Sequence, residues 1–320
     1  MTKEIYISDD MIQKIQKFDS IIFDCDGVLV DIRNSYDYAI NKTISAIMNE
    51  LFNEKISDVV NSKILYGLKS AGGFNDEVAV VYAVIMTLVA SKKSNLKFEK
   101  LIIDVIDNAN ESGINSIDNY FINQNIDLKE IKLKLDYENS RKISYIHRIF
   151  NQLFYGPVLY EEIFNEKSQF SEKPLIDLDN IVLDDNLMSK LKARFGNKIS
   201  TVTGRGNFAF SYSMKNFLNN FDMKNSVFLE DRPLNLAKPN PKSLIESISG
   251  INSKCSLYIG DSMEDLMMVE KCKEHGYDVS FCGIYGSSDE PELKYELFQK
   301  NKASFILESI QELPKALNLV

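Results

Sequence analysis

Four aspartates come directly after short apolar segments that have the character of buried strands. Asp24 and Asp26 belong to an Asp-Cys-Asp-Gly-Val sequence at the end of one such segment. Asp261 and Asp265 belong to a Gly-Asp-Ser-Met-Glu-Asp sequence at the end of another. Ligands of an open parallel sheet bind beyond the carboxyl ends of its strands, so we expect these carboxylates to converge at one edge of a sheet.

Hydroxyl and cationic groups follow two more segments of the same kind. Thr203, Gly204 and Arg205 come after one segment, and Lys238 lies in a Lys-Pro-Asn-Pro sequence beyond the next. Lys242 is an alternative for the role of Lys238. For Arg205 two interpretations stay open, a contact with a substrate and a salt bridge at the surface.

Carboxylates, a hydroxyl and a lysine at one edge of a sheet suit phosphoryl chemistry. Clustered carboxylates need a neutralising cation, and Mg²⁺ prefers oxygen ligands that include a substrate phosphate. One carboxylate can attack phosphorus, and a second can protonate the leaving oxygen and later activate water. Thr203 and Lys238 can hold the phosphoryl oxygens. Gly27 permits the backbone to bend directly after these two aspartates.

Strands and helices alternate over much of the chain. Six short segments rich in Ile, Val, Phe and Leu are predicted to be buried strands, namely 20–23, 199–202, 226–229, 256–259, 279–284 and 304–307. Helical spacing separates most of those after position 180, including a helix over 187–195 with Asp185 as its N-cap and one that opens at 289–292. This alternation predicts an α/β fold with a doubly wound parallel sheet.

The chain between the first two predicted strands is too long for a loop inside a compact domain. Most of it has the apolar spacing of helices, over 36–52, 76–90, 97–110 and 127–154. The total length of 320 residues also exceeds what one compact core usually holds. We therefore predict a core of residues 1–33 and 179–320, with a mainly α-helical domain of residues 34–178 inserted after the first strand.

Composition argues against several classes of protein. Lys and Arg number 37 and Asp and Glu 46, a net charge of −9 without a basic cluster, which disfavours nucleic acid as a partner. The longest apolar run, Val78 to Ala90, is too short to cross a membrane, and the first residues lack a signal-peptide pattern. We expect a cytoplasmic protein with reduced cysteines. Two histidines cannot form a three-histidine metal site, and no Gly-x-Ser-x-Gly sequence supports a serine hydrolase.

The four motifs together resemble those of the haloacid dehalogenase superfamily, in the same order along the chain. They are strand-Asp-x-Asp-Gly-Val, strand-Thr-Gly-Arg, Lys-Pro and Gly-Asp-Ser-x-x-Asp. The large insertion after the first motif is similar to the cap of the subfamily with an early, mainly α-helical cap. The resemblance covers the core and implies a Rossmann-like sheet and a magnesium-dependent phosphatase that acts through an aspartyl phosphate on a small phosphorylated metabolite.

The resemblance also implies roles for the acids, position by position. Asp24 would be the nucleophile and a metal ligand. Asp26 would be the general acid and base, and its main-chain carbonyl would bind the metal. Asp261 would bind the metal directly, and Asp265 directly or through water.

The remaining motif residues would bind the phosphoryl group. Thr203 and Gly204 would hold its oxygens, and Lys238 would pair with both Asp24 and the phosphate. These residues cannot distinguish one monoester from another, so the inserted domain must choose the substrate.

A glycine-containing stretch of the insertion, 69–75, is the candidate for that choice. Lys69, Phe74 and Asn75 offer charge, an apolar face and an amide to a substrate. The alternative interpretation is a helix hairpin in which Asn75 or Asp76 caps the next helix.

Two other functions stay open. A phosphomutase of the beta-phosphoglucomutase kind would share the Asp-x-Asp-Gly-Val motif and the helical cap. A non-catalytic phosphate-binding protein would have no need of the nucleophile and metal acids, all of which this chain retains. A dehalogenase is disfavoured because that chemistry needs no second acid, and Asp26 is present.

Overall fold

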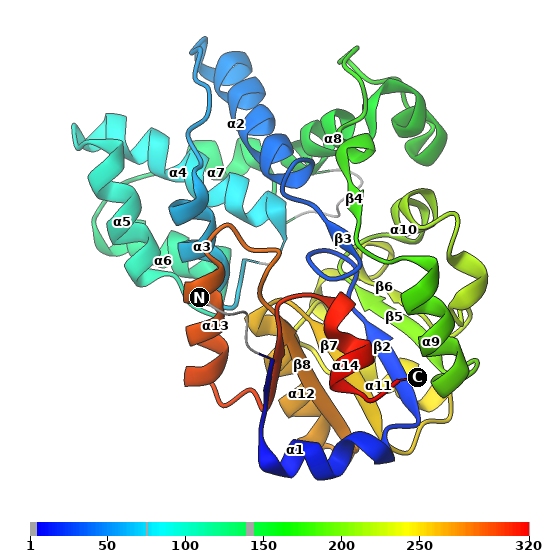
Figure 1. Ribbon diagram of the computed structural model, residues 1–320. Helices are drawn as coiled ribbons and strands as arrows, with labels where there is room; N and C mark the ends of the chain where they lie inside the picture. Colours follow the sequence, from blue (N-terminus) through cyan, green and yellow to red (C-terminus); the bar gives the residue numbers. More distant parts are fainter. Residues whose placement is uncertain (1–4, 75, 139–143, 320) are drawn as a thin grey trace. The chain divides into compact units, whose positions relative to one another are not determined.

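The computed structural model of the protein describes residues 5–74, 76–138 and 144–319 (Figure 1). The chain forms two compact units. One consists of residues 1–32 and 179–320, and the other of residues 33–178. The first is an α/β unit, which we call the core, and the second is helical and is called the cap.

The core contains a seven-stranded sheet with the order β1-β9-β8-β7-β2-β5-β6. Neighbouring strands are parallel, except that β1 is antiparallel to β9. The strands are β1 (Tyr6–Ile7), β2 (Ser20–Phe23), β5 (Ile199–Thr203), β6 (Val227–Phe228), β7 (Ser256–Gly260), β8 (Val279–Ile284) and β9 (Phe305–Leu307). Because β2 lies between β5 and β7, the chain passes to both sides of the first parallel strand, which makes the carboxyl end of β2 a switch point for ligand binding.

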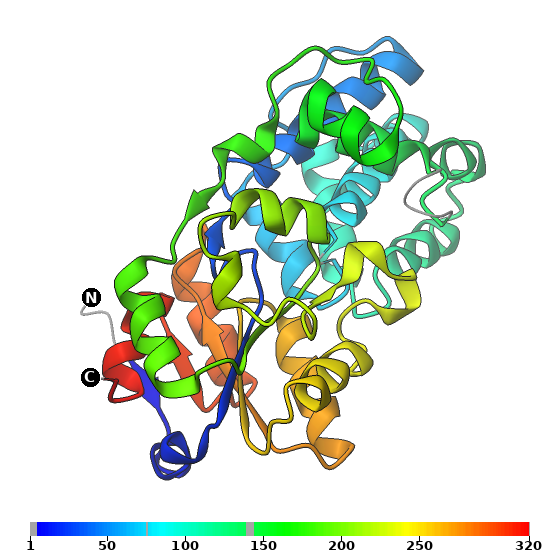
Figure 2. The same ribbon diagram turned by 90° about the vertical axis from the view of Figure 1, so that its right-hand side faces the viewer.

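Alternate residues of the strands bury two separate apolar clusters, one on each face of the sheet. Ile21 and Phe23 pack with residues of α9 and α14 on one face, whereas Ile22 packs with residues of α11 and α12 on the other. Figure 2 shows the sheet between these two sets of helices. The core helices are α1 (Asp9–Lys14), α9 (Asp185–Phe195), α10 (Asn207–Ser213), α11 (Lys242–Gly250), α12 (Met263–Glu274), α13 (Pro291–Lys300) and α14 (Leu313–Ala316).

A short antiparallel ribbon joins the two stretches of chain that lead into and out of the cap. It pairs β3 (Val30–Asp31) with β4 (Asn180–Ile181). The amide of Val182 also donates to the carbonyl of Leu29 at 2.9 Å. Both connections therefore belong to the core and are held to each other by backbone hydrogen bonds.

The cap is built around one helix that is apolar on every side. Each residue of α4 from Val78 to Ala90 is buried, as expected of a helix that other helices surround. It contacts α2, α5, α6, α7 and α8. The cap helices are α2 (Tyr36–Phe52), α3 (Ser62–Ser70), α4 (Glu77–Ser94), α5 (Phe98–Asn108), α6 (Ile114–Asn123), α7 (Lys129–Leu135) and α8 (Tyr145–Phe164). Short 3₁₀ turns complete both units, over 15–17, 175–178, 218–220, 229–231, 234–236 and 310–312.

The fold class predicted from the alternation of strands and helices is confirmed, and all six predicted strands form. Two details were wrong. The N-cap of α9 is Asp184, whose carboxylate accepts from the Leu187 amide, because the helix begins one residue earlier than its apolar spacing indicated. The predicted helix over 127–154 is two helices, α7 and α8, and α7 ends at Asp136 in the left-handed conformation.

Candidate active site

The strand register brings three of the predicted motifs to one edge of the core sheet. Phe23, the last residue of β2, pairs with Thr201 of β5 on one side and with Ile259 of β7 on the other. Asp24 therefore emerges between the end of β5, at Thr203, and the loop that follows β7. Its amide donates to the carbonyl of Ile259 at 2.8 Å, which holds the start of the loop in place.

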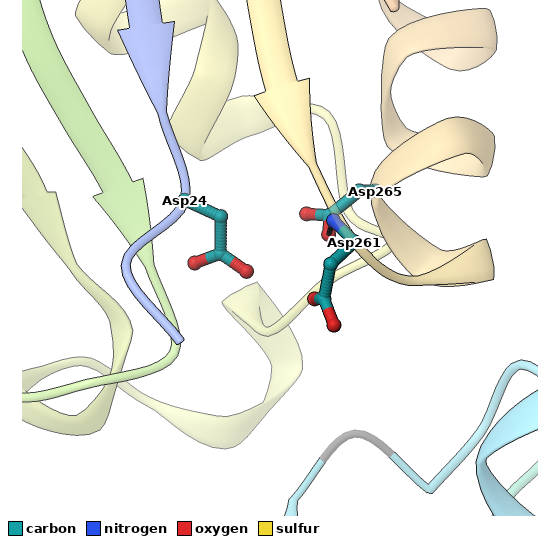
Figure 3. Close-up of side chains that lie close together, drawn as sticks. All are labelled: Asp24, Asp261 and Asp265. Carbon is teal, nitrogen blue, oxygen red and sulfur yellow. Dashed lines mark hydrogen bonds between the residues drawn. The ribbon is translucent and has the colours of Figure 1, made fainter. Parts of the chain in front are cut away.

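Asp24, Asp261 and Asp265 form a carboxylate cluster at this edge. Each offers an oxygen that lies within 4.8 Å of the others, and Figure 3 shows the three side chains around a common space. Gly27 makes this approach possible, since its φ of 73° turns the loop after Asp24. A Cβ atom on Gly27 would also lie only 2.3 Å from a carboxylate oxygen of Asp261.

Lys238 is the cation that pairs with this cluster. Its amine lies 3.0 Å from Asp24 Oδ2 and 2.7 Å from Asp265 Oδ1, and its side chain is almost completely buried. The alternative residue, Lys242, begins helix α11. One lysine therefore faces two buried carboxylates, a charge arrangement that a further cation would complete.

Asp265 is held by hydrogen bonds from several directions. Its carboxylate accepts from the Ser262 hydroxyl at 2.7 Å and from the Ser262 and Asp261 amides, while the Ser262 hydroxyl accepts from the Asp265 amide. This reciprocal pair is a capping box that begins helix α12. The hydroxyl of Tyr258 lies 2.8 Å from Asp265 Oδ1. Asp265 thus orients Lys238 as well as closing the helix end.

The two buried carboxylates differ in their proton affinity. Burial raises the pKa of Asp24 most, the charge of Lys238 opposes this, and the charges of Asp265 and Asp261 raise the pKa further. Burial also acts to raise the pKa of Asp265, but Lys238, Ser262 and Tyr258 together lower it below its usual value. The same two acids raise the pKa of Lys238 despite its burial. Asp265 and Lys238 are therefore the ionised pair, and Asp24 is the acid that needs another cation.

The donor set fits a hard divalent cation. Asp24 and Asp261 supply carboxylate oxygens of the kind that Mg²⁺ prefers. Asp261 is partly exposed, and its Oδ2 lies 2.6 Å from the amine of Lys294 on α13. Since Asp265 already accepts several hydrogen bonds, it fits the second layer around such a cation better than a place as a direct ligand.

Thr203 and Gly204 lie beside this cluster at the end of β5. Thr203 is buried, and its hydroxyl oxygen accepts from the backbone amide of Arg205 at 3.2 Å. Gly204 is exposed, and no atom lies within 4 Å of where its Cβ would be, so its backbone is accessible to a ligand. Glu230 and Asp231, which follow β6, accept from the amides of Gly206 and Asn207 at the start of α10.

Arg205 does not lie at the surface. Its side chain is fully buried, and its Nε donates to Asp26 Oδ1 at 2.9 Å. Its Nη1 donates to Asp179 Oδ2 at 2.7 Å and to the Ser213 hydroxyl at 2.8 Å. Asp26, the predicted general acid and base, is therefore part of a buried charge network.

Solved structures of other proteins share this architecture. A phosphatase, Tt82, from Thermococcus thioreducens has 23% sequence identity and a TM-score of 0.56, over 87% of this chain and 98% of that chain. The chain also has 15% identity and a TM-score of 0.49 to a haloacid dehalogenase-like hydrolase from Bacteroides fragilis, over 93% and 100% of the two chains. No protein-family model and no curated protein sequence matches the chain.

The similarity to the Thermococcus phosphatase covers most of this chain and nearly all of that one, and the four motifs follow strands of the core sheet. This chain shares the fold of that phosphatase. In the part of it that the structure describes, no helix has the length and apolar character needed to span a membrane.

Two of the predicted cap residues, Lys69 and Phe74, lie in or near the turn between α3 and α4. Lys69 is in the last turn of α3 and pairs with Glu77 at 3.1 Å. Phe74 is completely buried, and Asn75 lies outside the described residues. Asp76 is the N-cap of α4, since its carboxylate accepts from the Val78 amide at 2.9 Å.

Four side chains that contact the motif residues of the core were not among the residues predicted from the sequence. They are Tyr258, Asp179, Ser213 and Lys294. Asp179 belongs to an acidic stretch and Tyr258 to a predicted strand, but nothing local marks either as a partner of a motif residue. One available signal was overlooked, because Ser262 and Asp265 have the spacing of a capping box.

We predict that Asp24→Asn stabilises the protein when no metal is present. The folded state raises the pKa of Asp24 from 3.8 to about 8, so it binds a proton more tightly than the unfolded chain does. The stability that this provides is complete below the usual carboxyl value and is lost as the pH rises toward the folded value. Asparagine does not titrate in this pH range, so the variant does not lose stability in this way as the pH rises.

Thermal melts in chelator between these two pH values test this prediction. The melting temperature of Asp24→Asn should exceed that of the wild type by an amount that grows with pH. Asp185→Asn, which changes an exposed acid of α9, is the control and should follow the wild type. A difference between Asp24→Asn and the wild type that does not change with pH would contradict the prediction.

We also predict that Asp265→Asn destabilises the fold far more than Asp261→Asn. The first change leaves the buried amine of Lys238 without its closest partner, and breaking a buried ion pair in this way costs about 3–5 kcal/mol. Asp261 is partly exposed, so its loss costs little. Chemical denaturation of both variants measures the difference, and equal free energies of unfolding would show that Asp265 does not have this structural role.

Proposed function

We propose that this protein is a phosphatase that hydrolyses a small phosphate monoester through a phosphorylated Asp24. The observation that supports this most directly is the placement of Lys238 against Asp24, with Asp261 beside them at the carboxyl edge of the sheet. A carboxylate that is buried, oriented by an amine and clustered with a second acid is suited to act as a nucleophile.

The metal in this proposal is Mg²⁺, held by Asp24, Asp261 and the main-chain carbonyl of Asp26. When bound, it would neutralise the carboxylates and a phosphate oxygen and so allow the two anions to approach each other. Asp265 would contribute through a metal-bound water while it holds Lys238 in place.

The first half-reaction forms the covalent intermediate. A carboxylate oxygen of Asp24 attacks phosphorus, and the bond from phosphorus to the ester oxygen breaks. Asp26 gives its proton to the departing oxygen, so the alcohol leaves in its neutral form. Thr203, the Gly204 backbone and Lys238 hold the phosphoryl oxygens and offset their charge as it changes.

The second half-reaction returns the protein to its starting state. Asp26, now ionised, takes a proton from a water molecule as that water attacks phosphorus. The bond between phosphorus and Asp24 breaks, and inorganic phosphate leaves. One acid therefore acts first as proton donor and then as proton acceptor, and the proton that it lost is restored.

The nucleophile and the general acid are tested by separate variants of the full chain. Asp24→Asn should abolish turnover of p-nitrophenyl phosphate, because an amide cannot form the phosphoenzyme. Asp26→Asn should slow turnover by about 10²–10⁴-fold. Its phosphoenzyme should nevertheless accumulate, because p-nitrophenol leaves with little protonation and the later hydrolysis step still needs the base.

Rapid-quench labelling with Mg²⁺ present measures the intermediate, and a chelator should remove activity until Mg²⁺ is restored. Near-wild-type turnover in Asp24→Asn, or full activity in excess chelator, would refute the proposal. Transfer of the label to a sugar phosphate instead of water would identify a phosphomutase. Binding of phosphate without any turnover would identify a non-catalytic binding protein.

We further propose that Phe74 and Asn75 select the substrate, with Lys69 supplying charge for an acidic one. Once a panel of phosphorylated metabolites has identified the preferred substrate, Phe74→Ala and Asn75→Ala should each lower its kcat/KM by about tenfold or more. The loss on p-nitrophenyl phosphate should be much smaller, because that ester makes few contacts beyond its phosphate.

Burial of Phe74 makes a control for stability essential. Phe121→Ala removes another completely buried ring of the cap, on α6, and should lower the melting temperature without changing the ratio of the two activities. If Phe74→Ala behaves like Phe121→Ala, the turn serves to pack the cap and to begin α4 at Asp76, as its hydrogen bond to Val78 indicates.

A further inference from the structure

A buried arginine joins the predicted general acid to the ribbon of the core. Arg205 has no exposed side-chain surface, and both Asp26 and Asp179 lie against its guanidinium. Its Nε is 2.9 Å and its Nη2 is 2.5 Å from the same oxygen, Oδ1 of Asp26. Arginine is seldom buried so completely unless carboxylates pair with it.

The arrangement is poorly explained as a device for stability alone. Removing one guanidinium and two carboxylates from water has a desolvation free energy that offsets much of their mutual attraction. Apolar side chains of similar volume often stabilise a fold equally well. What the guanidinium does provide is orientation, because its planar fork fixes the position of a carboxylate in a way that a flexible amine does not.

Orientation is what Asp26 needs if it transfers protons. A general acid must be within hydrogen-bond reach of the atom that it protonates, so its side chain must keep one position. Asp26 lies in the loop between β2 and β3, and its side chain is about one-fifth exposed. It therefore reaches solvent on one side and Arg205 on the other.

The second carboxylate, that of Asp179, connects this network to the place where the chain returns from the cap to the core. Asp179 is the first residue of the core after the cap, and it directly precedes β4 of the ribbon. Its Oδ2 accepts from Arg205 Nη1 at 2.7 Å and from the Ser213 hydroxyl at 2.8 Å. Ser213 also contacts Nη1 at 2.8 Å, so Arg205 is held from α10 as well as from the ribbon.

We propose that Arg205 is the positioning residue for Asp26, and that Asp179 and Ser213 fix Arg205 in turn. Arg205 thus acts through Asp26 and does not itself contact the substrate. The inference rests on the proposed phosphatase function, because it assigns a role within the proton-transfer step. We therefore expect a substitution of Arg205 to impair the protonation of the leaving group and to leave the attack by Asp24 largely intact.

Arg205→Lys tests the inference with two esters that differ mainly in their leaving groups. Phenol is more basic than p-nitrophenol and needs the proton from Asp26 more. The variant should therefore lose about tenfold or more in kcat/KM on phenyl phosphate, but less than about threefold on p-nitrophenyl phosphate. In the Asp26→Asn background, Arg205→Lys should cause no further loss, since the residue that it positions is already disabled.

Arg194→Lys is the matched control. Arg194 is also partly buried in the core, on α9, but its guanidinium donates to the backbone carbonyls of Ile15 and Leu317. This variant should keep the wild-type ratio of activities on the two esters. Equal losses on both esters for Arg205→Lys, or a full additional loss in the Asp26→Asn background, would overturn the inference and leave Arg205 a structural residue.

Two further measurements keep the test decisive. If Arg205→Lys does not fold, Ser213→Ala and Asp179→Asn loosen the same guanidinium and should show the same dependence on leaving group to a smaller degree. Uniform losses in these variants would overturn the inference.

Phosphoenzyme formation at Asp24 in the wild type is measured alongside. If it is present, uniform losses contradict only the role of Arg205, whereas its absence contradicts the proposed function itself.

Discussion

The amine of Lys238 is shared between Asp24 and Asp265, and the arrangement of this edge of the sheet depends on that sharing. A lysine buried in this way is stable only when carboxylates surround it, and two buried carboxylates are tolerated only when a cation lies between them. The carboxylate of Asp265 is held in position because it also caps helix α12. The result is a rigid ion pair beside a second acid whose proton affinity is abnormally high.

The other charges of the edge follow the same rule. Asp261 lies against Lys294, and Asp26 lies against Arg205, so each acid of the candidate site has a cationic neighbour. These neighbours come from different parts of the core, Lys294 from α13 and Arg205 from the loop that follows β5. Because the acids are more numerous than the cations around them, a divalent metal would complete the charge balance and a substrate phosphate could then enter. The core thus provides a place in which negative charge is concentrated and held in order.

The cap has a different physical basis. Its central helix, α4, is buried from Val78 to Ala90, so the cap has an apolar interior of its own. The chain enters and leaves this unit through two connections that pair with each other as β3 and β4. Asp26 lies in the first connection and Asp179 at the start of the second, and the buried Arg205 holds both. Substrate choice is therefore proposed for the cap, and proton transfer for residues of the core that lie next to this ribbon in the sequence.

The sequence by itself determined the local features of this protein. Apolar runs specified all six predicted strands, because a buried strand needs continuous apolar side chains, and Asp24, Thr203 and Asp261 could be placed at their ends. Helix spacing identified α2 and the buried α4, whereas no bounds were predicted for α3 and α6. The N-cap of α9 was placed one residue late, since caps depend on a backbone angle that apolar spacing does not record.

Only the tertiary structure decided which charges meet. Nothing near Arg205 in the sequence indicates that it pairs with Asp26 and Asp179, which are remote along the chain. Likewise, the choice of Lys238 over Lys242 depends on which amine the loop after β6 carries to Asp24. Pairing of this kind is set by the register of parallel strands and by the desolvation of groups far apart in the sequence. The residue types show that such partners are needed, and the packed sheet determines which ones they are.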